Sequence, residues 1–522
     1  MNDLRLNVHL MKTTIRERIT TLLLGTMALG AGVAQGAEPV DVDYEATLIT
    51  TAGSGDFAPY YLNANRHGLL TQSANALLDI KAEKAPDLSR RFSWAFGVEA
   101  VGGWSEATAY ERYTPETGWT EHDLKPAAVR LQQLYGMVKW RGVFLSAGMR
   151  EHESALLNFR LSSGDLVESG NARPLPEVRM GFIDCQDIPF TNGWVQIQGE
   201  VSYGKFQDNK WVREHYNHYN YHYTQGSWLN YKRCYFRTKP SQPLSVTVGA
   251  QCSNVFAGRS YYYNHGEHTS TQHFSGHFRD FIEAFLPVNS REDFRLGNSL
   301  GSWDLKARYR LRGGAKLSAY FQWPWEDGSG LGRRNGWDGL WGIEYEAPTR
   351  GWLDGAVVEY LDFTNQSGPL HWATGDRPGT TITGDATGAD DYYNNVYYNS
   401  YANYGLSIGT PFMKAPLFNT DGYPAYTGNR LRGFHIAAQG HPTDATYWRA
   451  AVSYRKAWGN GMTILKKPQH DFSMMIEGSY RIGAVEGLLV GGAVAVDRGN
   501  MFGNNFGVEI TVKYAGLLKV KK

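Results

Sequence analysis

Apolar and polar side chains alternate along many segments of this chain, most clearly from Trp303 to Leu311. Every second position of that segment is apolar, and the positions between hold Asp304, Lys306, Arg308 and Arg310. Because successive side chains of a strand point to opposite faces, one face is apolar and the other is charged. Charges on one face cannot lie in a dry core. A transmembrane barrel accommodates this strand, since lipid covers the apolar face and a polar lumen receives the charged one.

The same two-residue period predicts sixteen strands, most of them of the length that a tilted membrane strand needs. We therefore predict an all-β fold, a single transmembrane antiparallel β-barrel of 16–18 strands over residues 76–522, with long extracellular loops. The predicted strands are Ala76–Lys84, Phe92–Gly102, Val129–Lys139, Val143–Met149, Val195–Tyr203, Leu229–Arg237, Leu244–Gln251, Trp303–Leu311, Lys316–Trp323, Leu340–Glu346, Ala356–Phe363, Leu431–Gln439, Tyr447–Lys456, Phe472–Ile482, Leu488–Asp497 and Phe506–Tyr514.

Long polar and aromatic segments separate these strands at residues 205–231, 254–299, 364–404 and 410–430. In outer-membrane barrels the periplasmic turns are short and the long loops lie outside. These segments are therefore expected to form a recognition surface or to fold inward and close the lumen. Residues 37–75 are predicted to be an irregular segment, either periplasmic or part of a plug.

The N-terminus has the order of a secretory signal, with Arg16 and Arg18 before an apolar run at residues 19–31 and Ala34-Gln35-Gly36 after it. We predict a signal peptide over residues 1–36. After it, no run approaches the roughly 20 apolar residues that a spanning helix needs. A helical inner-membrane protein is excluded, and a periplasmic, secreted or outer-membrane β protein remains.

Composition favours the outer membrane, because 14% of the residues are aromatic, with 32 Tyr and 16 Trp, while mean hydropathy is only -0.43. Aromatic girdles and a polar lumen produce this combination. A large secreted β-sandwich or propeller is the alternative. The net charge of +1 argues against a nucleic-acid partner, and three cysteines, an odd number, argue against a disulfide framework.

Three separated motifs then suggest a family. They are PYYLNANRHGL with Asn63, Asn65 and Gly68; the run GNSLGS, WEDGSG and WDGLWG with Glu326, Asp327, Asp338 and Trp341; and DYYNNVYYNSYANYGLSIGTPF followed by NRLRGFHIAAQG, with Tyr404, Arg430, Arg432 and His435. Through them the chain resembles the Wzi-type capsule assembly proteins in their Bacteroidetes form.

The resemblance implies an 18-stranded monomeric barrel in the outer membrane, in contact with lipid, that binds capsular or exopolysaccharide as a lectin and helps to assemble or retain it at the cell surface. It implies no enzyme activity, no cofactor and no metal. The family's enterobacterial members also carry a periplasmic helical bundle. No pair of amphipathic helices is visible between Ala37 and Leu77, so that bundle is not expected here.

Saccharide binding suits the loop composition, because sugar sites combine stacking aromatic rings with amide and guanidinium groups. The candidate residues are Tyr392, Tyr393, Asn394, Asn395 and Tyr397, with Arg430 and Arg432 as partners for acidic sugars. Tyr is also the belt residue of membrane barrels, so a structural role is the alternative for each tyrosine.

Other chemistry has weaker support. Glu326, Asp327 and Asp338 lie in a Gly-rich loop, where such carboxylates ordinarily shape turns, although an acid/base pair or a calcium site stays open. His215, His218 and His222 have a spacing that a helix could turn into a metal site, whereas the surrounding Tyr and Asn favour a polar loop. The competing function from another class is a diffusion porin for small polar solutes or sugars, which the polar lumen faces alone would support.

Overall fold

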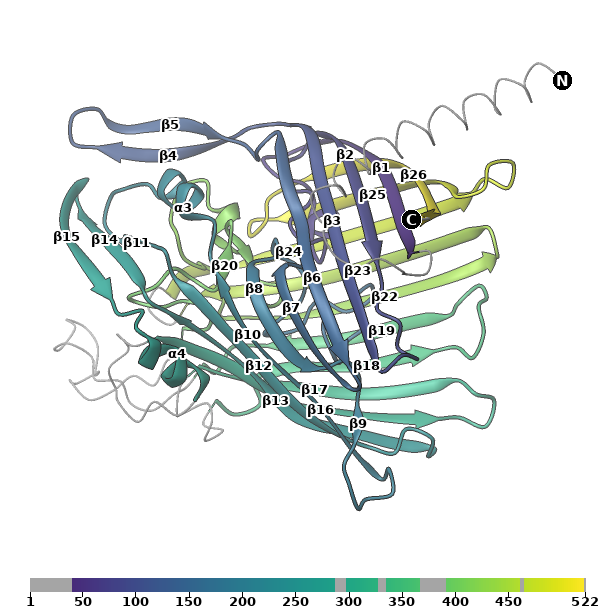
Figure 1. Cartoon of the computed structure of the whole chain (residues 1–522). Helices are drawn as coiled ribbons and strands as arrows, with labels where there is room; N and C mark the ends of the chain where they lie inside the picture. The colour runs from purple at the N-terminus through teal and green to yellow at the C-terminus, as the bar shows by residue number, and fades with distance from the viewer. Residues whose placement is uncertain (1–39, 287–296, 327–334, 367–390, 461–463, 521–522) are drawn as a thin grey trace, which may run out of the picture.

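Eighteen antiparallel strand positions close into one barrel in the computed structural model, which describes residues 40–286, 297–326, 335–366, 391–460 and 464–520. Each strand pairs with its neighbours in chain order, and β1 pairs with β26 from Val40–Val520 to Ser54–Phe506 to close the sheet (Figure 1). The strands are β1 (Val40–Ser54), β2 (Asn75–Lys84), β3 (Phe92–Ser105), β6 (Val129–Trp140), β7 (Val143–Met149), β8 (Pro176–Phe182) continued by β9 (Gln186–Asp187), β10 (Val195–Lys205), β12 (Trp228–Thr238), β13 (Leu244–Phe256), β16 (Asn298–Arg310), β17 (Lys316–Trp325), β18 (Gly339–Glu346), β19 (Gly355–Asp362), β22 (Leu431–Thr443), β23 (Thr446–Gly459), β24 (Ile464–Arg481), β25 (Leu488–Gly499) and β26 (Phe506–Val520).

All sixteen predicted segments coincide with barrel strands, and two further strand positions complete the barrel. One is β1, so the prediction of an irregular segment over residues 37–75 is wrong for residues 40–54. Its alternation is broken because Ile49 points into the lumen and packs there with Leu70, which leaves apolar residues on both faces. The other is β8 with β9, which was missed because residues 183–185 interrupt it. The predicted signal peptide lies outside the described residues.

Only short turns join the strands at one end of the barrel, and all of the long connections lie at the other. Figure 1 shows the short turns and the C-terminus at the right and the long connections at the left. In outer-membrane barrels the short turns face the periplasm. The long connections therefore lie at the extracellular end.

The two faces of each strand have the environments that the alternation predicted. On β16, Trp303 and Leu305 point outward and stay exposed on the apolar outer surface. On its inner face, Lys306 Nζ lies 2.8 Å from Glu344 Oε2, and Asp304 accepts a hydrogen bond of 2.7 Å from the Tyr235 hydroxyl. Asp304 and Lys306 of the charged face therefore have partners on other strands inside the barrel.

Connections that fold inward fill the middle of the lumen. Residues 55–74 between β1 and β2, residues 150–175 between β7 and β8, and residues 391–430 before β22 contribute side chains to one hydrophobic core that also includes wall residues. The core residues from the connections include Tyr60, Leu62, Leu161, Val167, Tyr393, Tyr401, Phe412 and Leu417, and those from the wall include Tyr320, Leu361, Ala437 and Met475. We call these three connections the plug. The long loops were expected either to form an external recognition surface or to fold into the lumen. The packing of residues 391–430 shows that this segment folds into the lumen.

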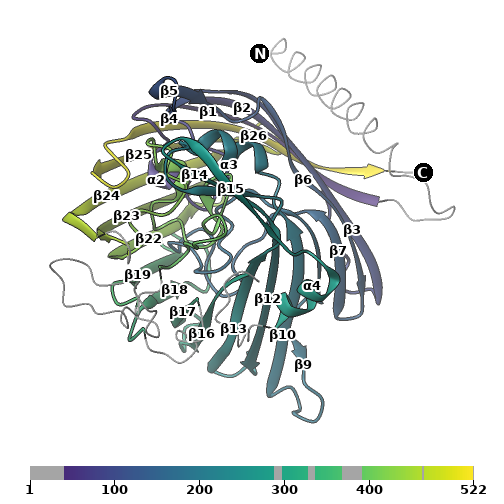
Figure 2. The ribbon, with the colours of Figure 1, turned by 90° about the vertical axis from the view of Figure 1, so that its left-hand side faces the viewer.

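Smaller elements cover the extracellular end, where Figure 2 shows α3, β14 and β15 over the barrel opening. They are β4 (Thr108–Thr114) with β5 (Gly118–Leu124), α3 (Asn209–His215), and the sheet of β11 (His222–Gln225), β14 (Gly258–Asn264) and β15 (Glu267–Phe274). Within the plug lie α2 (Tyr60–Asn63), β20 (Ala402–Asn403), β21 (Leu406–Ser407) and the 3-10 helix η2 (Pro416–Phe418).

One short helix, α4 (Phe278–Phe285), packs on the outside of the barrel against β12 and β13. Its Phe281 ring lies 5.1 Å from that of Trp228 and 5.0 Å from that of Phe256. Among the described residues, none of the helices has the length and apolar character needed to cross a membrane.

Candidate functional site

The predicted tyrosine and asparagine loop lies inside the plug, not on a free surface. Tyr392 and Tyr393 are 1% and 3% exposed, and Asn394 is also buried. The Tyr392 hydroxyl accepts a hydrogen bond of 2.8 Å from Asn335 Nδ2, and the Tyr393 hydroxyl donates to the Leu166 carbonyl. Asn394 exchanges hydrogen bonds of 2.9 and 2.8 Å with the backbone of Tyr426. Their polar groups are used to hold the plug together, and a saccharide cannot reach them in this arrangement.

The half-buried residues of the same loop also shape the backbone. Asn395 Oδ1 accepts hydrogen bonds from the backbone N–H of Tyr397 at 2.9 Å and of Tyr398 at 3.1 Å, an Asx-type turn. The Tyr397 carbonyl accepts hydrogen bonds from Thr224 and Ser260 of the capping sheet. This segment therefore ties the plug to the extracellular cap.

The two candidate arginines diverge from that loop. Arg430 donates from Nε to the Thr364 carbonyl at 2.9 Å. Arg432 points to the outside of the barrel, is 49% exposed, and lies 3.6 Å from Asp362. The structure therefore does not bring the seven candidate residues together at one binding surface.

The residues of the first motif stabilise the first connection of the plug and tie it to the second. Asn63 Nδ2 donates to the Leu70 carbonyl at 2.6 Å, and Asn65 Nδ2 donates to the Ser162 carbonyl at 3.2 Å. Gly68 has a φ of +67°, and a Cβ there would lie 2.7 Å from Arg173 Cγ. Only glycine suits this close approach in the left-handed region.

The motif carboxylates likewise support turns. Asp338 accepts hydrogen bonds from the backbone N–H of Asn365 at 3.0 Å and of Gln366 at 2.8 Å. Glu326 accepts one from the backbone N–H of Tyr393, and Asp327 lies outside the described residues. Trp341 is on the outer surface, stacked on Phe321 with ring centroids 3.8 Å apart. In these positions Glu326 and Asp338 support turns, and Trp341 is an aromatic belt residue. For the carboxylates, the sequence analysis had kept acid/base chemistry and a calcium site open as alternatives to this structural role.

The three histidines do not converge. His215 is buried in α3 and stacks on Trp211, His218 Nε2 lies 2.9 Å from the Arg213 carbonyl, and His222 Nε2 lies 3.3 Å from the Tyr398 carbonyl. In the part of the chain that the structure describes, no group of three His, Cys, Asp or Glu side chains could hold a metal ion.

A cavity of about 510 Å³ opens at the extracellular end between α3, the base of the β4–β5 hairpin and the start of β6. We call it the rim pocket. Two half-buried aromatic residues, Trp211 and Tyr404, line it together with Arg173. The Arg173 guanidinium lies 4.3 Å from the centre of the Tyr404 ring. A flat aromatic and cationic wall of this kind can take the apolar face and the acidic groups of a sugar.

Local contacts fix both rings of the rim pocket. The Tyr404 hydroxyl donates to the Gln207 carbonyl at 3.1 Å, and its backbone N–H donates to Asp208 Oδ2 at 3.1 Å. The Trp211 ring stacks on the His215 imidazole at 4.5 Å. Burial raises the pKa of Asp208 to about 6 and lowers the pKa of His215 to about 3, so His215 is neutral at physiological pH.

The charged groups of the rim pocket are mostly cationic. Lys125, Arg130, Arg173 and Lys210 line it, against one acid, Glu214, which lies 3.7 Å from Lys210. Among the described residues, the buried Arg130 Nε and Gln72 Oε1 have no hydrogen-bond partner. The pocket thus combines positive charge with unused donor and acceptor capacity.

Gly68, Tyr404 and Leu406 of this pocket belong to motifs that the sequence singled out. Arg173, Lys125 and Trp211 come from three other connections, and nothing in the linear order of the chain relates them.

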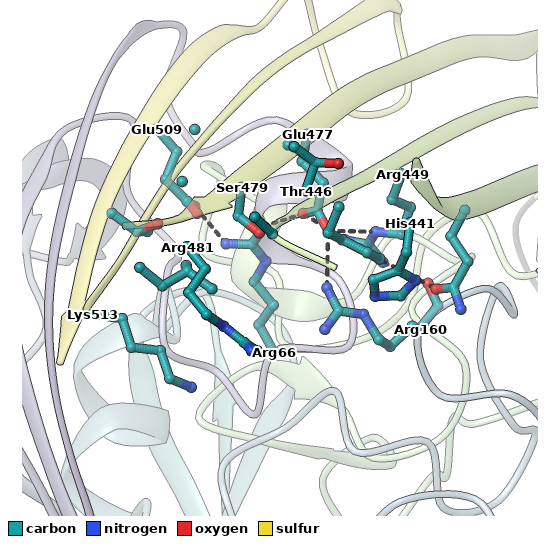
Figure 3. A pocket seen from close by; sticks show the side chains of 18 of the residues that line it. Arg66, Arg160, His441, Thr446, Arg449, Glu477, Ser479, Arg481, Glu509 and Lys513 are labelled. Atoms are coloured by element: carbon teal, nitrogen blue, oxygen red, sulfur yellow. Dashed lines mark hydrogen bonds and ion pairs between the residues drawn. The ribbon is translucent and has the colours of Figure 1, made fainter. Parts of the chain in front are cut away.

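A second cavity, of about 630 Å³, lies below the plug toward the short turns, and we call it the vestibule. Figure 3 shows three arginines around Glu477 on its wall. Arg66, Arg160 and Arg449 lie 3.5, 3.0 and 2.9 Å from its carboxylate oxygens, and Arg66 also pairs with Glu509. Because Arg66 and Arg160 come from two plug connections, this network fastens the plug to the barrel wall.

Comparison with known proteins supports the fold. No family model matches the chain, and no curated protein matches it. Among solved structures, one similar chain is the Escherichia coli outer-membrane protein Wzi, described as involved in group 1 capsule assembly and as a carbohydrate-binding β-barrel. The two chains are 14% identical, the match covers 90% of this chain and 84% of that chain, and the TM-score is 0.54. Others are Acinetobacter baumannii OccAB2 (10% identity, 92% and 98% covered, TM-score 0.44) and Pseudomonas aeruginosa OccK3 (10%, 92% and 96%, 0.41).

The chain has the fold of a Gram-negative outer-membrane β-barrel. Its apolar outer surface, its closed sheet and the likeness to Wzi all agree on this point.

Proposed function

We propose that this protein is a non-enzymatic outer-membrane barrel that binds capsular or exopolysaccharide and helps to assemble or retain it at the cell surface. The observation that carries the proposal is the rim pocket, an aromatic and cationic cavity on the extracellular side of a filled lumen. The resemblance of three motifs to those of Wzi-type proteins and the structural likeness to a carbohydrate-binding barrel support the same function.

The chemistry of the rim pocket favours a polysaccharide with acidic sugars. The faces of Trp211 and Tyr404 suit the C–H surfaces of a pyranose ring, and Arg173 can bind a carboxylate through two parallel hydrogen bonds. Lys125 and Lys210 add positive charge at the mouth, where an extended polymer would pass.

Binding of an acidic polysaccharide to the purified barrel tests the proposal. Arg173→Gln removes a charge-assisted hydrogen bond, and its expected effect is an affinity loss of about tenfold or more. The matched control is Arg279→Gln on the outer helix α4, where the side chain is largely exposed. Equal loss in both variants, or no binding of any acidic or neutral glycan by the wild type, would reject the assignment.

In cells, deletion of the gene is expected to leave polymer synthesis intact and to shift polymer from the cell surface to the medium. Unchanged attachment would contradict the proposal. The predicted secretory signal at residues 1–36 and the monomeric state belong to the same proposal, and are checked by the N-terminus of the mature protein and by its mass in detergent.

The second candidate is a diffusion porin. The polar inner faces of the strands favour it, as at Lys306 and Glu344, but the hydrophobic plug in the mid-lumen favours a closed barrel. Reconstitution in planar bilayers separates the two, because steady conductance supports the porin and a closed baseline supports the binding protein.

A further inference from the structure

A cluster of cations faces outward at the extracellular ends of β22 to β25. On β22, Leu431, Gly433 and His435 are buried on the lumen side, whereas Arg432 and Phe434 alternate with them on the outer side. The same alternation places Lys456 on the outer face of β23 and Arg498 on that of β25. These cations therefore share a face with the lipid-contacting residues.

Strand register brings the cations together. Arg432 lies opposite Lys456, and Lys456 lies opposite His470 of β24. Arg498 lies opposite Phe472, which is one side-chain pair away from His470 on the same face. Because neighbouring strands are about 4.8 Å apart, the cluster extends across roughly 15 Å of the barrel surface. We call it the outer basic cluster: Arg432, Lys456, His470 and Arg498.

The apolar band begins directly beneath Arg432, Lys456 and His470, at the level of Arg498. Phe434, Tyr454 and Phe472 form one cross-strand row, two residues along their strands from Arg432, Lys456 and His470. Two residues of a strand correspond to about 7 Å. Ile436, Val452 and Met474 form the next row toward the periplasm. The outer basic cluster is therefore at the level where hydrocarbon gives way to lipid headgroups.

Aromatic and polar contacts hold the cations in place. Arg432 and Lys456 lie 5.5 and 5.1 Å from the centre of the Trp458 ring, which belongs to the same outer face. Arg432 also donates to Thr364 Oγ1 at 3.0 Å, and His470 Nδ1 lies 2.5 Å from the Tyr454 hydroxyl. Such contacts reduce the number of side-chain arrangements that a ligand has to order.

The cluster has more cations than acids. Arg432 is 3.6 Å from Asp362, whereas neither Lys456 nor Arg498 has a carboxylate within 4 Å among the described residues. A cation that lies at the depth of the lipid headgroups and has no carboxylate partner within the protein can pair with an anionic group of the membrane. In contact with the outer leaflet, the fitting group is a phosphate, which Arg can bind in bidentate fashion and Lys as a point charge.

We propose that the outer basic cluster binds the phosphates of a phosphorylated glycolipid headgroup in the outer leaflet. The site is separate from the rim pocket, and it gives Arg432 a role different from the sugar contact that the sequence suggested. Binding there would fix the barrel's depth and surround its extracellular end with ordered glycolipid.

The test uses the full barrel in detergent, with lipid A carrying two phosphates as the probe and enzymatically dephosphorylated lipid A as the comparison. Native mass spectrometry counts the bound lipid and gives its affinity. We expect the phosphorylated form to bind more tightly, and Arg432→Gln/Lys456→Gln/Arg498→Gln to weaken its binding by about fivefold for each charge removed. The control removes three cations in short turns: Arg90→Gln/Arg91→Gln/Lys239→Gln.

Three results would overturn the proposal. Equal binding of both lipid forms would mean that only the acyl chains are recognised, and full competition by inorganic phosphate would mean that a free anion, not a lipid, is the ligand. If the triple variant lost affinity for acidic polysaccharide and kept its lipid affinity, the cluster would be a glycan surface instead. Unchanged mobility of the folded triple variant on unheated gels confirms that the barrel is intact.

Discussion

One fully buried arginine contributes to fastening the plug to the wall, and its removal should loosen the plug. Arg455 of β23 is 0% exposed. Its guanidinium lies 3.7, 4.7 and 4.9 Å from the ring centres of Tyr60, Phe412 and Phe502, which come from three different connections. Asp471 of the neighbouring strand lies 3.1 Å from Arg455 Nη1. We predict that Arg455→Met opens the lumen intermittently.

Two contributions determine how far Arg455→Met destabilises the closed arrangement of the plug. Leaving Asp471 buried without its cation costs about 3–5 kcal/mol. The three stacked rings lose a desolvated cation–π contact, about 2 kcal/mol. Because some of this is recovered by relaxation, we expect about 4 kcal/mol, which shifts a closed-to-open equilibrium by roughly a thousandfold. Arg455→Met/Asp471→Asn removes both charges and should restore most of the first contribution.

Single-channel recording and thermal unfolding measure the effect. Arg455→Met should show brief openings absent from the wild type and a lower unfolding temperature, and the double variant should fall between the two. Arg432→Met is the matched control, because it makes the same change on the outer surface and should leave the baseline closed. If Arg455→Met keeps both the closed baseline and the wild-type unfolding temperature, the plug is not held by this arginine.

Three further predictions concern pH, backbone strain and cysteine exposure. Burial raises the pKa of Asp208 to about 6, so folding favours the neutral form of this carboxyl group. The unfolding free energy of the wild type should therefore fall relative to that of Asp208→Asn as pH rises from about 4 to 6, by at most about 3 kcal/mol, and then level off. Urea unfolding at several pH values measures this difference. Gly68→Ala should lower the unfolding free energy by about 1–3 kcal/mol because its φ is +67°, whereas Gly136→Ala, with open space around it, should not. A small maleimide should label Cys234, which is exposed, faster than Cys252, which is buried; the reverse order would contradict this difference in burial.

Much of the barrel was predictable because lipid and lumen impose a two-residue period on a strand. This period identified sixteen strand positions, including Trp303–Leu311, whose charged face meets Glu344 inside the barrel. It failed where the lumen is not polar. On β1, Ile49 packs against Leu70 of the plug, so the local pattern no longer distinguishes the two faces.

The candidate site was predicted less well, for a different reason. Tyr and Asn side chains suit a sugar site, but the same hydroxyl and amide groups also satisfy one another in a packed interior, as Tyr392 and Asn394 do. Composition cannot separate these uses, because the difference lies in what surrounds the side chain. Arg432 is a comparable case, since its position next to Arg430 hides the fact that it points toward lipid.

The sequence by itself determined the membrane barrel, since the alternation of lipid-facing and lumen-facing residues is local and is written along each strand. Tertiary structure alone decided that the lumen is filled and that Trp211, Tyr404 and Arg173 share one pocket. Both depend on connections distant in sequence packing against each other, and that packing is set by the closed geometry of the barrel, not by any local period.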